Sequence, residues 1–278
     1  MESIRIDSHQ HFWNYDPKRH TWMSDEMTLL KNNFLPPDLL PYLQKCNLDA
    51  CVAVQAEQSE DENTFLLNLA ENFDFIKGIV GWVDFQADNL EERLSYYSQF
   101  PKMKGFRHIL QDEQQRDFML RPAFMRGISK LEKYNFSYDI LIFTDQLPYA
   151  LDFVKAFPQQ SFVIDHLAKP LIKQQIVGDW RTYIEKIASY RNVYCKISGM
   201  VTEADWKQWK NEDFKIYLDL VVEAFGIDRL MYGSDWPVCT LAANYEEQFA
   251  IIQEYFSSFS RSEQDQLFGI NASSFYHL

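Results

Sequence analysis

The chain has 278 residues, of which 46% are hydrophobic and 24% are charged, a composition typical of a globular protein with a large buried core. Its formal net charge of −13 argues against binding to nucleic acid, which requires clustered lysine and arginine. No apolar run reaches the roughly 18 residues of a membrane span. We expect no secretory leader, because the first strand begins near Ile4, and the four cysteines show no paired spacing. We therefore expect a cytoplasmic protein that contacts neither membrane nor nucleic acid.

Short runs of β-branched and aromatic residues alternate along the chain with stretches whose apolar residues recur at helical spacing. From the N-terminus, the runs predict strands at 4–7, 50–55, 76–84, 103–109, 138–143, 162–166, 193–198 and 229–233. The helical stretches between them lie at 63–73, 90–100, 147–157, 180–190 and 214–225. Eight such units, with no linker and no glycine-rich phosphate turn, predict one (β/α)8 barrel of the α/β class over residues 1–278. The segment 14–40 is too long for an ordinary connection, and we expect it to form a lid.

His9 and His11 lie two residues apart on the first strand, at its carboxyl end. Residues at this spacing point to the same face, here the barrel interior, near the rim where the loops after all eight strands meet. Imidazoles in this arrangement are common ligands of divalent metals. The pair therefore predicts a metal or catalytic site at this end of the barrel.

Two further candidates stand at the carboxyl ends of later strands. His166 ends the sixth predicted strand, and Asp235 follows the eighth after Gly233 and Ser234. Both would reach the rim that carries the histidine pair. A carboxylate at this place could accept a proton from an attacking water as a general base. The structural alternatives are a packed histidine and a carboxylate that serves as a helix cap or turn acceptor.

The fourth predicted strand ends with Arg107 and His108. Adjacent strand residues face opposite sides, so only one of the two should point into the site. The guanidinium of Arg107 in the site could bind a substrate oxygen or stabilise an oxyanion. A structural ion pair would suit this arginine equally well. His20 and His277 have no such placement and are expected to be surface or structural residues. Residues that could line a pocket or simply fill the barrel are Trp82 and Asp84 on the third strand and Lys196 and Ser198 on the seventh.

Four segments occur in a characteristic order: Asp7-Ser8-His9-Gln10-His11-Phe12-Trp13, Gly105-Phe106-Arg107-His108, Asp165-His166-Leu167-Ala168-Lys169-Pro170 and Gly233-Ser234-Asp235-Trp236-Pro237. Together they resemble the amidohydrolase superfamily, and within it the group of sugar-lactone hydrolases. The segment 268–276 is also similar to the C-terminal helix of that group. The resemblance extends over nearly the whole chain and implies a (β/α)8 barrel with its site at the carboxyl ends of the strands.

The resemblance also implies the roles of the site residues. His9, His11 and His166 would be metal ligands or site histidines, and Asp235, which could also be a ligand, would activate water. Superfamily members with two metals carry a lysine or glutamate on strand four and a histidine on strand five. Here the fifth predicted strand reads Tyr138-Asp139-Ile140-Leu141-Ile142-Phe143, without a histidine. We therefore expect at most one divalent ion, with zinc the best candidate, which some members of the group do not need for turnover.

The activity that the resemblance implies is hydrolysis of a sugar-derived lactone to its aldonic acid, with L-fucono- and L-rhamnono-lactone as candidate substrates. Asp235 would deprotonate water, while Arg107, His108 or a bound metal stabilises the oxyanion. His166 would orient the water or pass a proton to the ring oxygen. Two alternatives stay open, a zinc-dependent decarboxylase of the same superfamily and a barrel that binds a sugar acid without turnover, and self-association into a homo-oligomer is compatible with each. The residues expected to contact the sugar are Trp13, Trp82, Lys169 and Trp236.

Overall fold

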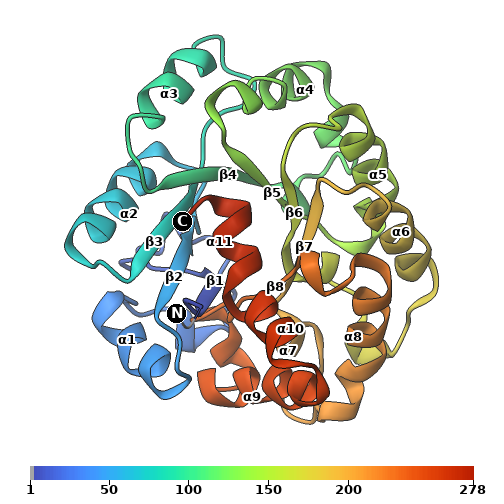
Figure 1. Ribbon diagram of the computed structural model, residues 1–278. Coiled ribbons are helices and arrows are strands. Elements are labelled where there is room, and N and C mark those ends of the chain that lie inside the picture. Colours follow the sequence, from blue (N-terminus) through green and yellow to red (C-terminus); the bar gives the residue numbers. More distant parts are fainter. Residues whose placement is uncertain (1–2) are drawn as a thin grey trace.

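Eight parallel strands follow one another around a ring, in sequence order, in the computed structural model, which describes residues 3–278 (Figure 1). The ring closes where Asp235 N donates to His9 O at 2.8 Å and His11 N donates to Trp236 O at 2.7 Å. The predicted (β/α)8 barrel is therefore confirmed. The strands are β1 (Ile6–Gln10), β2 (Ala50–Val54), β3 (Ile76–Gly81), β4 (Met103–Ile109), β5 (Ser137–Leu141), β6 (Phe162–Ile164), β7 (Val193–Ile197) and β8 (Leu230–Tyr232).

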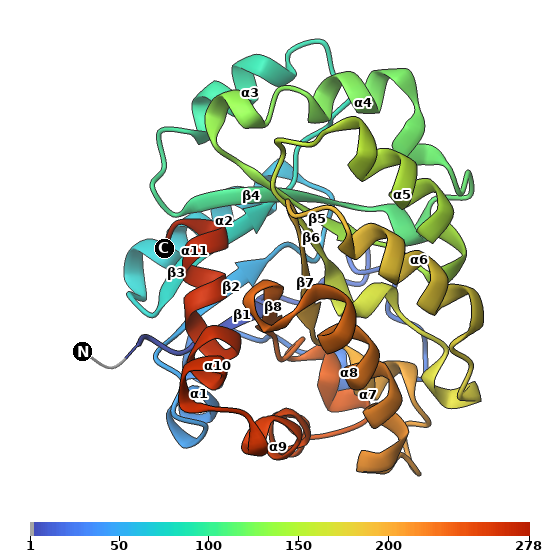
Figure 2. The same cartoon turned by 45° about the vertical axis from the view of Figure 1, so that its right-hand side comes forward.

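Helices surround this ring on its outer side (Figures 1 and 2). The five predicted helices are α2 (Glu60–Asn72), α3 (Leu90–Tyr97), α5 (Leu147–Ala156), α6 (Gly178–Ala188) and α8 (Asn211–Phe225). The remaining helices were not assigned from apolar spacing in the sequence. They are α1 (Pro36–Lys45), α4 (Pro122–Ile128), α7 (Met200–Glu203), α9 (Tyr245–Tyr255), α10 (Arg261–Asp265) and α11 (Asn271–Tyr276), the last within the C-terminal helix that the resemblance implied. No helix within residues 3–278 is both long and apolar enough to cross a bilayer.

The core has two apolar layers, one between the strands and the surrounding helices and one inside the barrel. The inner layer is made by strand residues such as Ile6, Val52 and Val163, and α11 adds Phe275 and Tyr276 to it. This helix lies across the end of the barrel at which the strands begin (Figure 1). The opposite end stays free for the loops that follow the strands, which is where such barrels carry their sites.

Three strands differ from their predicted bounds in a way that affects the site. β1 runs to Gln10 and includes His9, because its backbone continues to pair with β2 as far as Ala53. His11 follows just beyond its end. β6 and β8 stop at Ile164 and Tyr232, so His166 and Asp235 lie in the turns after these strands. Both have left-handed backbone, with φ values of 53° and 57°.

Candidate active site

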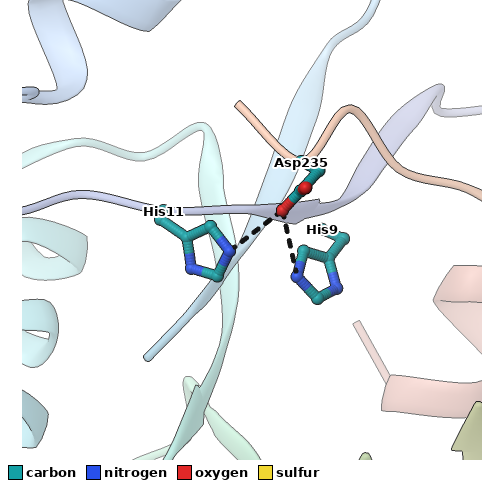
Figure 3. A group of neighbouring side chains, drawn as sticks. All are labelled: His9, His11 and Asp235. Atoms are coloured by element: carbon teal, nitrogen blue, oxygen red, sulfur yellow. Dashed lines mark hydrogen bonds and ion pairs between the residues drawn. The ribbon is translucent and has the colours of Figure 1, made fainter. Parts of the chain in front are cut away.

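Three imidazoles converge on one carboxylate at the carboxyl end of the barrel. His11 Nε2 lies 3.3 Å from Asp235 Oδ1, and the Nε2 atoms of His9 and His166 each lie 3.8 Å from the same oxygen. Figure 3 shows the rings of His9 and His11 turned toward Asp235. All four side chains are buried. We call these residues the rim cluster. The structure thus brings together all four residues that were predicted to hold a metal.

The turn after β6 carries His166 in an unusual backbone conformation. Four consecutive residues, 166–169, adopt positive φ, which costs roughly 1–2 kcal/mol for each residue that is not glycine. Two carbonyl groups of this turn accept hydrogen bonds from other parts of the chain: Thr144 Oγ1 donates to Lys169 O at 2.9 Å and Trp180 Nε1 to Leu167 O at 2.7 Å. The surrounding structure therefore holds this strained turn, and with it His166, in one place.

Two glycines make room for the histidines. A Cβ on Gly199 would lie 2.6 Å from Nδ1 of His166, and one on Gly233 would lie 2.6 Å from Cβ of His9. Gly199 also has a φ of 62°, which a larger residue adopts only with strain. Only glycine allows the backbone just after β7 to approach the ring of His166, and the backbone just after β8 to approach His9, so closely.

Burial and the neighbouring groups set the charge of the rim cluster. Burial lowers the pKa of His166 to about 4 and that of His9 well below its usual value. Burial alone would raise the pKa of Asp235. The neighbouring His166 and the hydrogen bond with His11 outweigh it and hold that pKa well below the ordinary value. Asp235 is therefore ionised at neutral pH, facing a neutral His9 and a neutral His166.

A second set of charged residues lies deeper in the barrel, below the rim cluster. Lys196 Nζ contacts Asp139 Oδ2 at 2.5 Å and Asp165 Oδ1 at 3.0 Å, and Arg107 NH1 donates to Asp165 Oδ2 at 3.0 Å. All four are buried, and two cations balance two carboxylates. We call Arg107, Asp139, Asp165 and Lys196 the interior cluster. It joins the rim cluster through His9, whose Nδ1 lies 3.2 Å from Asp165 Oδ1.

Above the rim cluster lies a cavity of about 330 Å³. His11, His166, Asp235 and Arg107 form part of its wall. Trp22 and Met27, from the segment 14–40 that was expected to be a lid, also form part of its wall. Other lining residues that matter for binding are Trp13, Ile109, Leu141, Phe143, Lys169 and Glu203. The last two form an ion pair, with Lys169 Nζ 3.4 Å from Glu203 Oε1.

Several predicted site residues lie outside this cavity. Arg107 faces the barrel interior, so its neighbour His108 faces outward, stacked on Phe118 with Nε2 2.8 Å from Glu113. The structure thus moves His108 out of the catalytic set, because adjacent strand residues cannot share a face. Trp82 lies against His108, with Nε1 3.4 Å from its Nδ1, and does not line the cavity.

Trp236 is also placed in the core and not in the cavity. It is 2% exposed, and its ring packs edge-on against Phe12 and Phe34. Its backbone, not its side chain, contacts the site, through the hydrogen bond to His11. Two other histidines match their expected structural or surface roles. His20 is buried beside the backbone of Asp16, and His277 is exposed.

Some residues that shape the site were not assigned from the sequence. Asp165 and Asp139 received no role, and Lys196 was left between pocket lining and barrel filling. The signal that could have found Lys196 and Asp139 is a lone charge inside an otherwise apolar strand, which needs a buried partner. Their partners, however, come from different strands, and the sequence does not show which charges meet.

The rim cluster meets the chemical requirements of a divalent cation. His11 Nδ1 lies 2.8 Å from Val54 O, which can only accept, so a neutral His11 carries a lone pair on Nε2. That lone pair faces the Asp235 carboxylate at 3.3 Å, and two acceptors in this position need a proton or a cation between them. Atoms that bind zinc tetrahedrally at about 2.0–2.1 Å lie about 3.3 Å from one another, close to the distances in the cluster. His9, His11 and Asp235 therefore fit a metal ion.

A family model described as amidohydrolase matches residues 6–278. The chain belongs to the amidohydrolase family. It is 38% identical over 289 aligned residues to L-fucono-1,5-lactonase of Burkholderia multivorans, an alignment that covers 100% of this chain and 97% of the relative. A crystal structure of an amidohydrolase from Burkholderia multivorans with bound zinc superposes with a TM-score of 0.96 at 38% identity, covering 99% of this chain and 100% of that one. A 5-carboxyvanillate decarboxylase from Novosphingobium aromaticivorans shares 12% identity and a TM-score of 0.71 over 99% and 96% of the two chains, a likeness of fold alone.

Proposed function

We propose that this protein hydrolyses the lactone of a sugar acid to the open-chain acid, with L-fucono-1,5-lactone or a close 6-deoxy analogue as substrate. The observation that carries the proposal is the ionised Asp235, held by three histidines at the wall of a cavity that also contains Arg107. The full-length similarity to L-fucono-1,5-lactonase supports it. A cavity of about 330 Å³ suits a small substrate, since it lies at the lower end of the range for ligand sites.

Asp235, Arg107 and His166 each have a separate role in the proposed reaction. Asp235 takes a proton from a water molecule as the water oxygen forms a bond to the lactone carbonyl carbon. The positive charge of Arg107 stabilises the oxyanion that forms. When the carbonyl is restored, the bond to the ring oxygen breaks, and the proton that Asp235 took from the water is delivered to that oxygen, directly or through His166, whose Nε2 faces Asp235. Water is consumed, and the products are one carboxylic acid and one freed hydroxyl.

Asp235 is ionised at neutral pH, because its pKa lies below the ordinary value, so the base is ready to accept a proton. A lactone is an activated ester, so a carboxylate base beside the positive charge of Arg107 is sufficient for attack by water.

We further propose that one divalent ion, zinc by preference, binds to His9, His11 and Asp235, with His166 beside it. Such an ion would polarise the carbonyl and lower the pKa of bound water. The interior cluster argues against a second ion on the other side of His9, because Lys196 Nζ already lies 3.1 Å from His9 Nδ1. Dialysed protein should contain no more than one zinc per chain by mass spectrometry. Two zinc ions per chain would contradict this stoichiometry.

The substrate proposal is tested with a matched pair of lactones in a pH-indicator assay. L-Fucono-lactone and L-galactono-lactone differ only in that the second carries a hydroxyl on C6. The apolar side chains of Ile109, Leu141 and Phe143 in the cavity should favour the methyl compound, by about 10–100-fold in kcat/KM. The assay is run before and after chelation, so that the contribution of a metal is measured separately. If neither compound nor any other aldonolactone releases acid, the proposed function is wrong.

A further inference from the structure

Lys169 and Glu203, in the wall of the cavity, form an ion pair that uses little of its capacity for hydrogen bonds. Lys169 Nζ lies 3.4 Å from Glu203 Oε1, and neither charged group makes a hydrogen bond to another group within residues 3–278. An ammonium has three N–H donors, and a carboxylate has about four acceptor sites. Both side chains are nonetheless mostly shielded from solvent, at 17% and 21% exposed. Most of these donors and acceptors therefore have no partner in the protein.

An ion pair in the loops after β4 and β5 has the opposite character. Arg116 donates two hydrogen bonds of 2.7 Å to Asp145, although these side chains are 31% and 59% exposed. Charged groups that lose contact with water need close partners, because their hydration is lost. Here the more buried pair, Lys169 with Glu203, is the one that stays open. Its geometry therefore suits a ligand that supplies the missing hydrogen bonds.

The turns that carry the two residues fix the position of the pair. Lys169 ends the strained turn after β6, and its carbonyl accepts the hydrogen bond from Thr144. Its Nζ lies 5.2 Å from the centre of the Phe143 ring, which attracts the cation without taking up its donors. Glu203 is the last residue of α7, the short helix after β7. The pair is therefore part of the rigid wall of the cavity above the rim cluster.

We propose that Glu203 and Lys169 determine specificity by binding two adjacent hydroxyl groups of the substrate, one of which donates to Glu203 while the other accepts from Lys169. The nature of this substrate rests on the proposed lactone hydrolysis. A hydroxyl can donate or accept, whereas a carboxylate only accepts and an ammonium only donates. Two neighbouring hydroxyls of a sugar therefore satisfy both charges at once. An anionic group in the same place would be repelled by Glu203.

The test compares two lactones that differ only in their hydroxyl groups. L-Fucono-1,5-lactone carries hydroxyls on C2, C3 and C4, and the matching enantiomer of δ-hexanolactone has the same ring and methyl group without them. Glu203→Gln keeps the shape of the side chain and removes its charge. This variant should lower kcat/KM for L-fucono-1,5-lactone about 10–100-fold and leave that for δ-hexanolactone almost unchanged. Lys169→Met should discriminate between the two lactones in the same direction.

Asp205→Asn is the matched control. Asp205 lies two residues beyond Glu203, and its ion pair with Lys173, at 3.2 Å, is exposed and lies outside the cavity. This variant should leave kcat/KM for both lactones almost unchanged. Equal losses on the two lactones in Glu203→Gln would overturn the proposal, because an ion pair with a merely structural role would give that result. Wild-type kcat/KM for L-fucono-1,5-lactone in Glu203→Gln would overturn it as well.

Binding of a lactam separates this inference from the proposed function. L-Fucono-1,5-lactam carries the same hydroxyls on a ring that resists hydrolysis, so calorimetry gives its dissociation constant without turnover. Glu203→Gln should raise that constant about 10–100-fold. A wild-type protein that hydrolyses no lactone but binds the lactam through Glu203 would refute the function and leave this inference intact. Equal dissociation constants in the wild type and Glu203→Gln, or no binding by the wild type, would overturn the inference.

Discussion

The rim cluster and the interior cluster are both buried, and each gathers side chains from several strands and the turns that follow them. The two clusters are adjacent, since Asp165 directly precedes His166. They differ in charge. The interior cluster sets Arg107 and Lys196 against Asp139 and Asp165, and each carboxylate contacts a cation within 3.0 Å. The rim cluster surrounds the carboxylate of Asp235 with imidazoles, of which His9 and His166 are neutral.

This difference separates a structural role from a chemical one. Removing ions from water costs several kcal/mol for each ion, and the interior cluster offsets this cost by close pairing. The rim cluster leaves its anion with weaker partners and opens to a cavity, so a substrate, a water or a metal can complete it. One barrel thus carries a charge-balanced interior cluster, of which Arg107 reaches the cavity, and a rim cluster whose carboxylate has no cationic side chain paired with it among residues 3–278. The predictions below test that division.

The largest loss of activity should follow from replacing Asp235, the carboxylate of the rim cluster. Asp235→Asn keeps the shape of the side chain but removes the base, so kcat/KM for a sugar lactone should fall about 10²–10⁴-fold. Circular dichroism should show an unchanged fold. Asp112→Asn is the matched control, because Asp112 lines the same cavity without being part of either cluster, and it should keep most of the activity. Wild-type kcat/KM in Asp235→Asn would exclude the base assignment.

Removing one charged side chain of the interior cluster should instead lower the stability of the protein. Lys196→Met leaves Asp139 and Asp165 buried without their shared cation, which should lower the free energy of unfolding by about 3–5 kcal/mol in urea denaturation. Lys215→Met removes the same charge from an exposed pair with Asp219 and should cost no more than about 0.5 kcal/mol. Equal losses in the two variants would show that the interior cluster is not the stabilising layer.

A smaller loss of stability and activity is expected when Gly199, whose backbone packs against His166 of the rim cluster, is replaced. Gly199→Ala places a Cβ against His166 and forces a left-handed conformation on alanine, at a cost of about 1–3 kcal/mol in unfolding free energy. Because His166 must shift, kcat/KM should also drop by about tenfold or more. Gly178→Ala, in an open position at the start of α6, should be neutral or stabilise the protein by up to about 1 kcal/mol. Full activity in Gly199→Ala would mean that the position of His166 is not critical.

The smallest effect concerns His108, which lies outside both clusters. Burial lowers its pKa, although Glu113 raises it in part. Below its ordinary pKa of 6.5, the unfolded chain therefore binds more protons than the folded one, and stability falls as the pH drops. His108→Gln should flatten this dependence in urea denaturation between pH 7 and pH 5. Glu113→Gln should steepen it, because the histidine then loses the partner that favours its charged form, and a flatter slope in that variant would contradict this explanation.

The sequence predicted the strands of the barrel and the residues of the rim cluster, but not all of its helices. The alternation of strand and helix patterns predicted all eight strands, because burial on both faces makes each strand of a barrel a short apolar run. Short helices such as α7 and α10 were missed, since a single turn has no apolar period to recognise. His9, His11, His166 and Asp235 were predicted because each directly follows, or nearly ends, a strand and therefore reaches the same rim.

The choice between Arg107 and His108 shows what remained open. Strand alternation predicts that only one of them faces inward, but not which one, since that depends on the register of β4 against its neighbours. Trp236 was predicted to touch substrate because it follows Asp235. The left-handed turn at Asp235 directs the indole into the core instead.

The sequence alone thus determined that this is a barrel whose histidines and final aspartate gather at one end, because strand order and spacing are properties of the chain itself. Only the tertiary structure decided which charges meet inside it. Asp139 and Lys196 come from two strands, Asp165 from the turn after a third strand and Tyr276 from the last helix, and their contacts depend on register and on closure of the ring. No local pattern in the sequence encodes those contacts.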